Sequence, residues 1–273
     1  MLQSYQMSMI GGYYMNTCEN YAVVLDLDRT LLKDDHTIGE LTKETLLEFK
    51  KQGGKIIIAT GRAIARSKKY MDEINADGLV ALNGSVSYIK EDMIAQTPIN
   101  KELVYDMIQR ILSIGDVFMS LAYPTRMITN NPKFAVPGVN DFTDFKEFSL
   151  DEIQKLNIFT SKGKELLAID FSSYGCKVLT NDANPEYFVV TQSDVNKMTG
   201  LLPIFENLGI KKENAISFGD DYNDIEMLEE CGIGVVMANG AEDVKTKGNY
   251  ITEDNNNDGV GKWLNEYFHL LNN

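Results

Sequence analysis

Two aspartates lie two residues apart, directly after a short apolar run. The run is Ala22–Leu25, and Asp26 and Asp28 follow it. The run predicts a buried strand of a parallel sheet, so both carboxylates fall at the carboxyl end of that strand, where open α/β sheets bind ligands. Alternate side chains of an extended segment point the same way, and two like charges so close favour a bound cation. The same pair could equally be a solvated acidic turn at the end of a strand.

Further reactive side chains occur where predicted strands end or helices begin. These are Thr60 with Gly61, Lys197, and the acidic segment Asp220–Asp224. Each has an ordinary alternative: a helix cap for the threonine, a solvated charge for the lysine, and a helix start favoured by the dipole for the acidic segment. All of these alternatives would have to hold together at one edge of one sheet, so the pattern favours a single site.

The order of predicted elements indicates an α/β fold with an insertion. Strands and helices alternate on both sides of a central segment, which predicts a Rossmann-like doubly wound parallel sheet. The core is expected at residues 1–84 and 193–273, with 1–20 as a flexible extension, and residues 85–192 have the antiparallel α+β texture of an inserted domain. Within the insertion we expect a hairpin at 86–97, a helix at 102–113, strands at 117–122 and 126–129, loops at 130–148, a short helix near 150–155, and strands near 166–171, 176–180 and 186–191.

Composition excludes several classes of protein. The chain of 273 residues is 44% hydrophobic, and its net charge of -14 argues against a general nucleic-acid or anionic-membrane surface. Cys18, Cys176 and Cys231 are widely spaced and indicate neither a disulfide framework nor a zinc site, which fits a reducing cytoplasm. We find no secretory signal and no membrane span. We therefore expect a cytoplasmic protein whose partner is a small molecule; its oligomeric state stays open.

These motifs together resemble those of the haloacid dehalogenase (HAD) superfamily of phosphohydrolases. The first motif corresponds to Asp26–Leu31, the second to Thr60, the third to Lys197 and the fourth to Gly219–Asp224. The form of the fourth motif, the Asn83–Gly84 turn and the large insertion are similar to the Cof-type branch (subfamily IIB, C2B cap). The resemblance implies a HAD core with an inserted C2-type cap domain.

The first motif suits phosphoryl transfer, and the resemblance implies a role for each carboxylate. Asp26 is the expected nucleophile, which forms an aspartyl-phosphate. Asp28 is the expected acid for the leaving alcohol and the expected base for the hydrolytic water. A carboxylate at this second position resembles the phosphatases of the superfamily, whereas the dehalogenases lack it. Arg29 departs from the family pattern, which usually has glycine, and could add positive charge near the cap.

The resemblance also implies a magnesium site and a phosphate site. Asp26 and Asp220 would bind Mg²⁺ through carboxylates and Asp28 through its backbone carbonyl, because this ion prefers oxygen ligands. Asp224 would hold the ligand sphere or Lys197 in place. The groups expected to hold the phosphate oxygens are Thr60, the backbone amides of Leu27 and Gly61, Lys197 and Asn223.

The expected function is magnesium-dependent hydrolysis of small phosphorylated metabolites, such as sugar phosphates or similar phosphomonoesters. Phosphomutase-like phosphotransfer is the alternative within enzymes, and a phospho-receiver or a catalytically silent binding protein is the alternative outside them. A receiver is much shorter and has no inserted domain, and every group expected of an active enzyme is present. The substrate itself is not readable, because Tyr123, Arg126 and Lys133 of the insertion could face the site or be ordinary surface.

Overall fold

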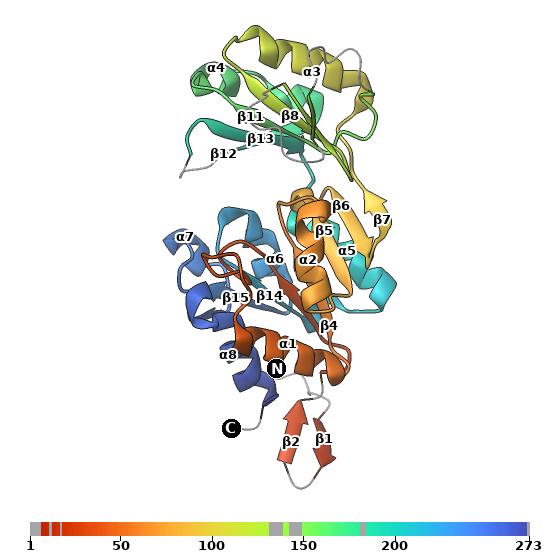
Figure 1. The fold of residues 1–273 in the computed structure, drawn as a ribbon, viewed down its shortest axis with the longest axis vertical. Helices are drawn as coiled ribbons and strands as arrows, with labels where there is room; N and C mark the ends of the chain where they lie inside the picture. Colours follow the sequence, from red (N-terminus) through yellow and green to blue (C-terminus); the bar gives the residue numbers. More distant parts are fainter. Residues whose placement is uncertain are drawn as a thin grey trace. The chain divides into compact units, whose positions relative to one another are not determined.

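The chain folds into two compact units (Figure 1). The computed structural model describes residues 7–10, 13–16, 18–130, 139–141, 149–180 and 184–271. The core unit comprises Met1–Gly61, Ser67–Ile94 and Asn196–Asn273, and the inserted unit comprises Arg62–Arg66 and Ala95–Val195.

An eight-stranded sheet is the framework of the core unit. Its strands are β3 (Ala22–Leu25), β4 (Lys55–Ala59), β5 (Gly78–Ala81), β6 (Val86–Ile89), β7 (Asp92–Gln96), β14 (Ala215–Gly219), β15 (Ile233–Met237) and β16 (Tyr250–Thr252). The strand order is β16-β15-β14-β3-β4-β5-β6-β7. From β16 to β5 each neighbouring pair is parallel, whereas β6 is antiparallel to β5. The predicted doubly wound parallel sheet is therefore confirmed.

Helices cover both faces of this sheet, which explains why its central strands are continuous apolar runs. The helices described outside the inserted segment are α1 (Glu40–Lys51), α2 (Ile64–Glu73), α5 (Lys197–Leu208), α6 (Ile225–Glu230), α7 (Glu242–Lys245) and α8 (Gly259–Phe268). On one face, Val24 and Ile57 share a buried cluster with Leu201 of α5. On the other, the Phe268 ring of α8 lies 5.3 Å from the Phe49 ring of α1. Full burial of each such side chain contributes about 1.5–3 kcal/mol.

The inserted unit has its own sheet and core. Its strands are β8 (Phe118–Ala122), β9 (Met127–Thr129), β10 (Val139–Asp141), β11 (Lys155–Phe159), β12 (Cys176–Thr180) and β13 (Tyr187–Gln192), in the order β10-β9-β8-β11-β13-β12. Its helices are α3 (Lys101–Ser113) and α4 (Gly163–Leu167). Leu156 and Ile158, alternate residues of β11, are buried with Val104 and Ile108 of α3. The mostly antiparallel α+β texture of this segment is as predicted.

Parts of the inserted segment differ from the prediction. The hairpin β6–β7 continues the core sheet, so the inserted unit resumes at Ala95 instead of beginning at Ser85. Alternating apolar residues identify a hairpin but do not tell which sheet it joins. The helix predicted near 150–155 is absent from the described residues; strand β11 begins at Lys155. The strand predicted near 166–171 is replaced by α4 and a short 3-10 turn, Phe171–Tyr174. Most of the predicted loop 130–148 lies outside the described residues.

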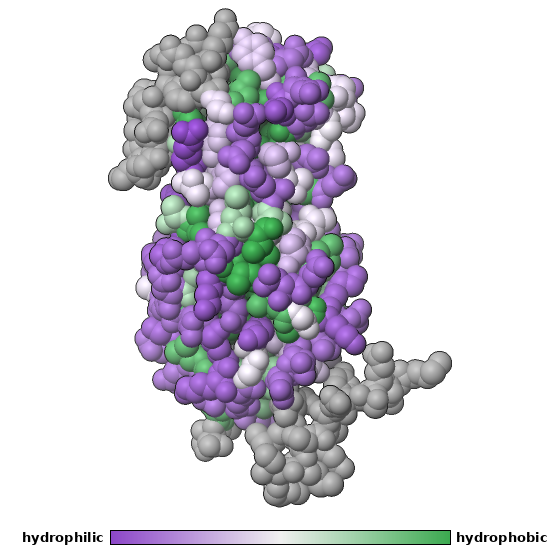
Figure 2. Space-filling model, turned by 90° about the vertical axis from the view of Figure 1, so that its right-hand side faces the viewer, coloured by the Kyte–Doolittle hydropathy of each residue, from purple (hydrophilic) through white to green (hydrophobic). Residues whose placement is uncertain are grey.

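The first residues and the surface complete the fold. The segment predicted as a flexible extension contains a small antiparallel sheet, in which β1 (Met7–Ile10) pairs with β2 (Tyr13–Asn16). Hydrophilic residues cover most of the described surface in Figure 2, in keeping with the net charge of -14. Within the described ranges, no helix is both long enough and apolar enough to cross a membrane.

The turn after β5 fixes the start of α5. Gly84 has φ +109°, and a Cβ atom added to it would lie 1.9 Å from the backbone oxygen of Asn196, the residue that caps α5. Gly200 of α5 is equally tight, because a Cβ there would lie 2.8 Å from the Cα of Gly84. Only glycine allows both this backbone angle and this approach.

We therefore expect Gly84→Ala to destabilise the core by about 3 kcal/mol or more, because the backbone of α5 would have to move. Gly209→Ala is the matched control: its φ is +68°, but a Cβ there would meet nothing within 4 Å. It should cost only about 1 kcal/mol of backbone strain. Thermal unfolding followed by circular dichroism checks both, and equal losses in the two variants would contradict the close approach at Gly84.

Candidate active site

Three buried carboxylates meet at the carboxyl edge of the core sheet. Asp26 follows β3 and Asp220 follows the neighbouring parallel strand β14, where the Asp26 amide donates to the Phe218 oxygen over 3.1 Å. Asp224 lies in the 3-10 turn after β14, and one ligand atom from each of the three carboxylates lies within 4.8 Å of the others. Their exposed fractions are 6%, 3% and 0% for Asp26, Asp220 and Asp224. Adjacent parallel strands thus assemble the cluster that the sequence predicted at one edge.

A fully buried lysine lies between two of these carboxylates. The Nζ of Lys197 is 2.5 Å from Oδ1 of Asp26 and 2.5 Å from Oδ1 of Asp224. Lys197 is the first residue of α5, and the Asn196 side chain caps this helix by accepting from the Thr199 amide over 2.8 Å. The helix cap therefore sets the point from which the lysine reaches the carboxylates.

Asp224 also fixes the loop that carries Asp220. Its Oδ2 accepts from the backbone amides of Asp220, over 3.0 Å, and Asp221, over 3.1 Å. Gly219 allows this arrangement, because a Cβ there would lie 2.5 Å from the Cβ of Asp224. With one oxygen on Lys197 and the other on two amides, Asp224 holds both the lysine and the loop.

The cluster holds more negative than positive charge, which shifts the pKa values of its members. Burial, together with the nearby charge of Asp224, raises the pKa of Asp220 to about 7 against the opposing effects of Thr30, Arg29 and Lys197. Burial likewise raises the pKa of Asp26 well above its ordinary value, although Lys197 opposes this. For Lys197, burial disfavours the charge, but Asp224 and Asp26 outweigh it and raise the pKa above its ordinary value. The lysine stays charged, and the surplus negative charge attracts further cations.

This donor set fits a hard divalent cation. Mg²⁺ prefers oxygen ligands, and it is commonly bound through one or two carboxylates while it keeps several waters. The cluster contains Asp26, Asp220 and Asp224, three of the four residues predicted as metal ligands. Asp28 is exposed on the turn after Asp26, and the contribution expected from its backbone carbonyl stays a prediction.

The first-motif turn is bound to the loop after β15. Arg29 has φ +63°, the left-handed conformation that explains why the family usually has glycine here. Its guanidinium donates to the Asn239 backbone oxygen over 3.0 Å and lies 3.9 Å from Oδ2 of Asp220. The Asn239 side chain donates back to the Arg29 carbonyl over 2.8 Å, and the Thr30 hydroxyl donates to Oδ1 of Asp220 over 2.9 Å.

The predicted phosphate-holding residues lie at the ends of neighbouring elements. Thr60 is buried directly after β4, and its amide donates to the Val80 oxygen over 2.9 Å. The Asn223 side chain donates to Oδ1 of Asn83 over 3.1 Å, and a Cβ at Gly61 would lie 2.8 Å from the same oxygen. Asn83 therefore connects the second and fourth motifs, a role that the sequence analysis missed. Its signal was the Asn–Gly turn directly after a strand.

Other predicted positions have different surroundings. Leu27 is buried. Tyr123 of the inserted unit is buried too, with its hydroxyl 2.5 Å from the Ser149 oxygen, and the Arg126 guanidinium lies 4.6 Å from its ring centroid. Tyr123 thus has a structural role, Arg126 remains an exposed candidate, and Lys133 lies outside the described residues.

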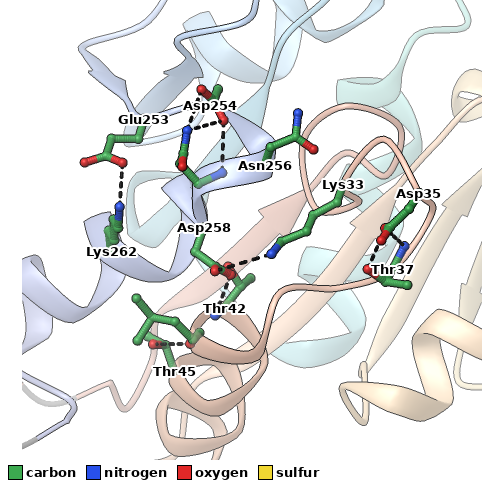
Figure 3. A network of polar contacts seen from close by, with 12 residues as sticks. Lys33, Asp35, Thr37, Thr42, Thr45, Glu253, Asp254, Asn256, Asp258 and Lys262 are labelled. Carbon is green, nitrogen blue, oxygen red and sulfur yellow. Dashed lines mark hydrogen bonds and ion pairs between the residues drawn. The ribbon is translucent and has the colours of Figure 1, made fainter.

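A polar network fixes the loop that follows the first motif (Figure 3). Asp258 accepts from the Thr42 amide over 3.2 Å and from its hydroxyl over 2.8 Å, and lies 3.8 Å from Nζ of Lys33. The Asp35 carboxylate accepts from the hydroxyl and the amide of Thr37, which closes the loop on itself. The segment before α8 therefore holds the loop that leaves the first motif.

A doubly wound sheet that gathers carboxylates, a lysine and a threonine at its carboxyl edge defines a HAD-type hydrolase. The chain matches the model of the haloacid dehalogenase-like hydrolases over residues 23–264, and it belongs to this family. The family and the phosphatase names of its relatives identify it as an enzyme, a phosphatase of phosphorylated small molecules.

Individual relatives agree with this class. The chain is 31% identical to a Bacillus subtilis 5-amino-6-(5-phospho-D-ribitylamino)uracil phosphatase, over 92% of this chain and 98% of the relative. It is 25% identical to the phosphoglycolate phosphatase of Methanopyrus kandleri, over 89% of this chain and 94% of the relative. It superposes on a HAD subclass IIB sugar phosphatase with a TM-score of 0.78 and 28% identity, over 92% and 100% of the two chains.

Because the pKa of Asp220 is raised, we expect the stability of the metal-free protein to depend on pH. A carboxyl whose pKa rises from 3.8 to about 7 on folding contributes stability below 3.8 and loses it as the pH rises through 7. Asp220→Asn removes this titration, so it should raise the melting temperature in excess chelator, and more at pH 8 than at pH 5. Asp72→Asn, on an aspartate whose side chain is 64% exposed, is the control and should show no such trend. If Asp220→Asn raised the melting temperature equally at both pH values, the raised pKa of Asp220 would be contradicted.

Proposed function

We propose that the protein is a magnesium-dependent phosphatase that hydrolyses phosphomonoesters of small polar metabolites, such as sugar phosphates, through an aspartyl-phosphate on Asp26. The observation that carries this proposal is the buried ion-pair network in which Lys197 joins Asp26 to Asp224, beside Asp220. Such a network combines a held nucleophile with fixed positive charge, and phosphoryl transfer depends chiefly on positioning and charge neutralisation.

Asp26 is the nucleophile in this proposal. Lys197 binds one of its carboxylate oxygens, which orients the other, and burial removes the water that would otherwise solvate the attacking charge. The carboxylate oxygen bonds to phosphorus while the bond from phosphorus to the leaving oxygen breaks. Water then attacks the phosphorus of the aspartyl-phosphate, which returns the free carboxylate and releases phosphate.

Asp28 is the proton carrier. It is exposed on the turn after the nucleophile, so it can meet both a substrate oxygen and water. It would give a proton to the departing alcohol and take one from the attacking water, as a single acid–base group does in two successive steps. The carboxylate of Asp28 is not a member of the buried cluster of Asp26, Asp220 and Asp224.

The remaining groups hold the phosphoryl oxygens and the cation. The carboxylates of Asp26 and Asp220 and the backbone carbonyl of Asp28 would hold magnesium, and Asp224 would keep these ligands or Lys197 in place. Bound magnesium would neutralise negative charge on the phosphoryl group during its transfer. The phosphate would be held by Thr60, the amides of Leu27 and Gly61, Lys197, and Asn223 as fixed by Asn83.

The relatives support the substrate class. Their names specify a phosphoribityl-substituted uracil, phosphoglycolate and sugar phosphates, all small phosphorylated molecules. We propose phosphomonoesters of comparable size and polarity for this chain. A panel of such esters, assayed for released phosphate with magnesium, tests the class, and no release from any of them would contradict it.

Replacement of the nucleophile gives the sharpest test of the mechanism. Asp26→Asn keeps the shape and an acceptor for Lys197 but removes the attacking charge, so kcat should fall about a thousandfold or more while the fold survives. Asp72→Asn is again the control and should keep wild-type turnover. Turnover should also vanish in excess chelator and return with magnesium. Near-normal turnover of folded Asp26→Asn would refute the covalent route, and full activity in chelator would refute the metal requirement.

We also propose that the inserted unit selects the leaving group. The core motifs contain every group assigned above to phosphate and metal, so the inserted unit is left to recognise the rest of the substrate. Arg126→Ala and Lys164→Ala replace cations of this unit at positions outside those motifs. We expect at least one to change the ranking of kcat/KM across the ester panel, while inhibition by inorganic phosphate stays within about twofold. If neither these two variants nor further alanine variants on the surface of the inserted unit changed the ranking of the esters, the inserted unit would have another role, such as oligomerisation.

A further inference from the structure

Arg29 places an additional fixed positive charge beside the carboxylate cluster. The Arg29 guanidinium lies 3.9 Å from Oδ2 of Asp220, although 63% of its side chain is exposed. An exposed arginine would ordinarily move freely, but the Asn239 backbone oxygen accepts from this guanidinium over 3.0 Å. The Asn239 side chain in turn donates to the Arg29 carbonyl over 2.8 Å and accepts from the Asn255 amide over 3.1 Å. Reciprocal bonds therefore hold the charge where it is.

The backbone at Arg29 has a conformation that is unfavourable for any residue other than glycine. Arg29 has φ +63°, where glycine is unstrained and a larger residue costs about 1–2 kcal/mol. The interactions of the side chain offset this cost, because they join the first-motif turn to the loop after β15. The arginine thus supplies a contact that glycine could not make.

A charge balance shows what the arginine does to a bound ion. The cluster of Asp26, Asp220 and Asp224 carries three negative charges when ionised, and Lys197 offsets one of them. Arg29 offsets a second, so a divalent cation enters a site of net charge -1 instead of -2. A fixed positive charge beside a metal ligand repels an incoming cation, and the repulsion is twice as large for a divalent ion as for a monovalent ion at the same distance, because Coulomb energy scales with the product of the charges.

We propose that Arg29 is a positioning residue that competes with the divalent cation for Asp220 and so weakens magnesium binding. This inference rests on the metal site of the proposed function. Arg29 acts through the carboxylate of Asp220 and takes no part in the transfer of the phosphoryl group. It sets the magnesium concentration at which the site fills, and it partly neutralises Asp220 when the ion is absent.

Titration of magnesium chloride into the chelator-treated full-length protein by calorimetry tests this. All variants are titrated at the same pH of about 8.5 in two buffers of different ionisation enthalpy, so that any proton release is measured and subtracted. Arg29→Gln removes the charge and should bind Mg²⁺ about fivefold more tightly at about 20 mM salt, with a smaller gain at about 300 mM because exposed charges are screened. Arg29→Lys keeps the charge and should stay within about twofold of wild type.

Two controls separate charge from its alternatives. Arg29→Gly removes both the charge and the backbone strain. If only the charge affects magnesium binding, its Kd for Mg²⁺ should equal that of Arg29→Gln. Lys68→Gln makes the same change in net charge on α2, where Lys68 pairs with Asp72 over 3.3 Å, and should leave the Kd for Mg²⁺ unchanged.

The outcomes distinguish this inference from the proposed function. If wild type binds Mg²⁺ and Arg29→Gln binds it equally or more weakly, the inference fails and the metal site stands. A raised KM for phosphate esters without a change in the Kd for Mg²⁺ would overturn it too, because Arg29 would then act on substrate. If wild type binds no Mg²⁺, both the inference and the magnesium requirement fail.

Discussion

The structure depends on the burial of more negative than positive charge at one edge of a sheet. Carboxylates in a place of low water content are costly unless each has a partner. Asp224 has Lys197 and two backbone amides, Asp26 shares the same lysine, and Asp220 has the Thr30 hydroxyl. These partners come from the start of α5 and from the loops after β3 and β14, and a surplus of negative charge still remains. A divalent cation removes that surplus, so the property that makes the site costly also makes it chemically useful.

Much of the site could be predicted because its signals are local. Apolar runs identify strands, and parallel strands that are neighbours bring the residues after them to one edge, which placed Asp26 and Asp220 together. Lys197 was found from a helix start. The hydrogen bonds of Asn83 and Asn239 could not be predicted, because they depend on which loops become neighbours. That follows from the strand order, and no local pattern in the sequence specifies it. Arg29 was noticed only as a departure from a family pattern.

The errors in the inserted segment have the same cause. The β6–β7 hairpin was recognised correctly as a hairpin, but its membership of the core sheet depends on the partner strand β5. The strand β11 pairs with β8 on one side and β13 on the other, and neither partner is close to it in the sequence. Short elements of this kind have weak intrinsic preferences, so tertiary pairing decides between helix and strand. The core strands are continuous apolar runs that alternate with helices, and this regular order leaves less to such pairing.

The position of β14 between β3 and β15 has a consequence for synthesis on the ribosome. β3 emerges early, but its neighbour on one side is β14, which is made only after the whole inserted unit. Until then the nascent chain has an unpaired edge on what will be a central apolar strand, a feature that favours association with other chains. The carboxylates of Asp220 and Asp224 also arrive late. Newly made chains therefore need protection of this edge until β14 has been made.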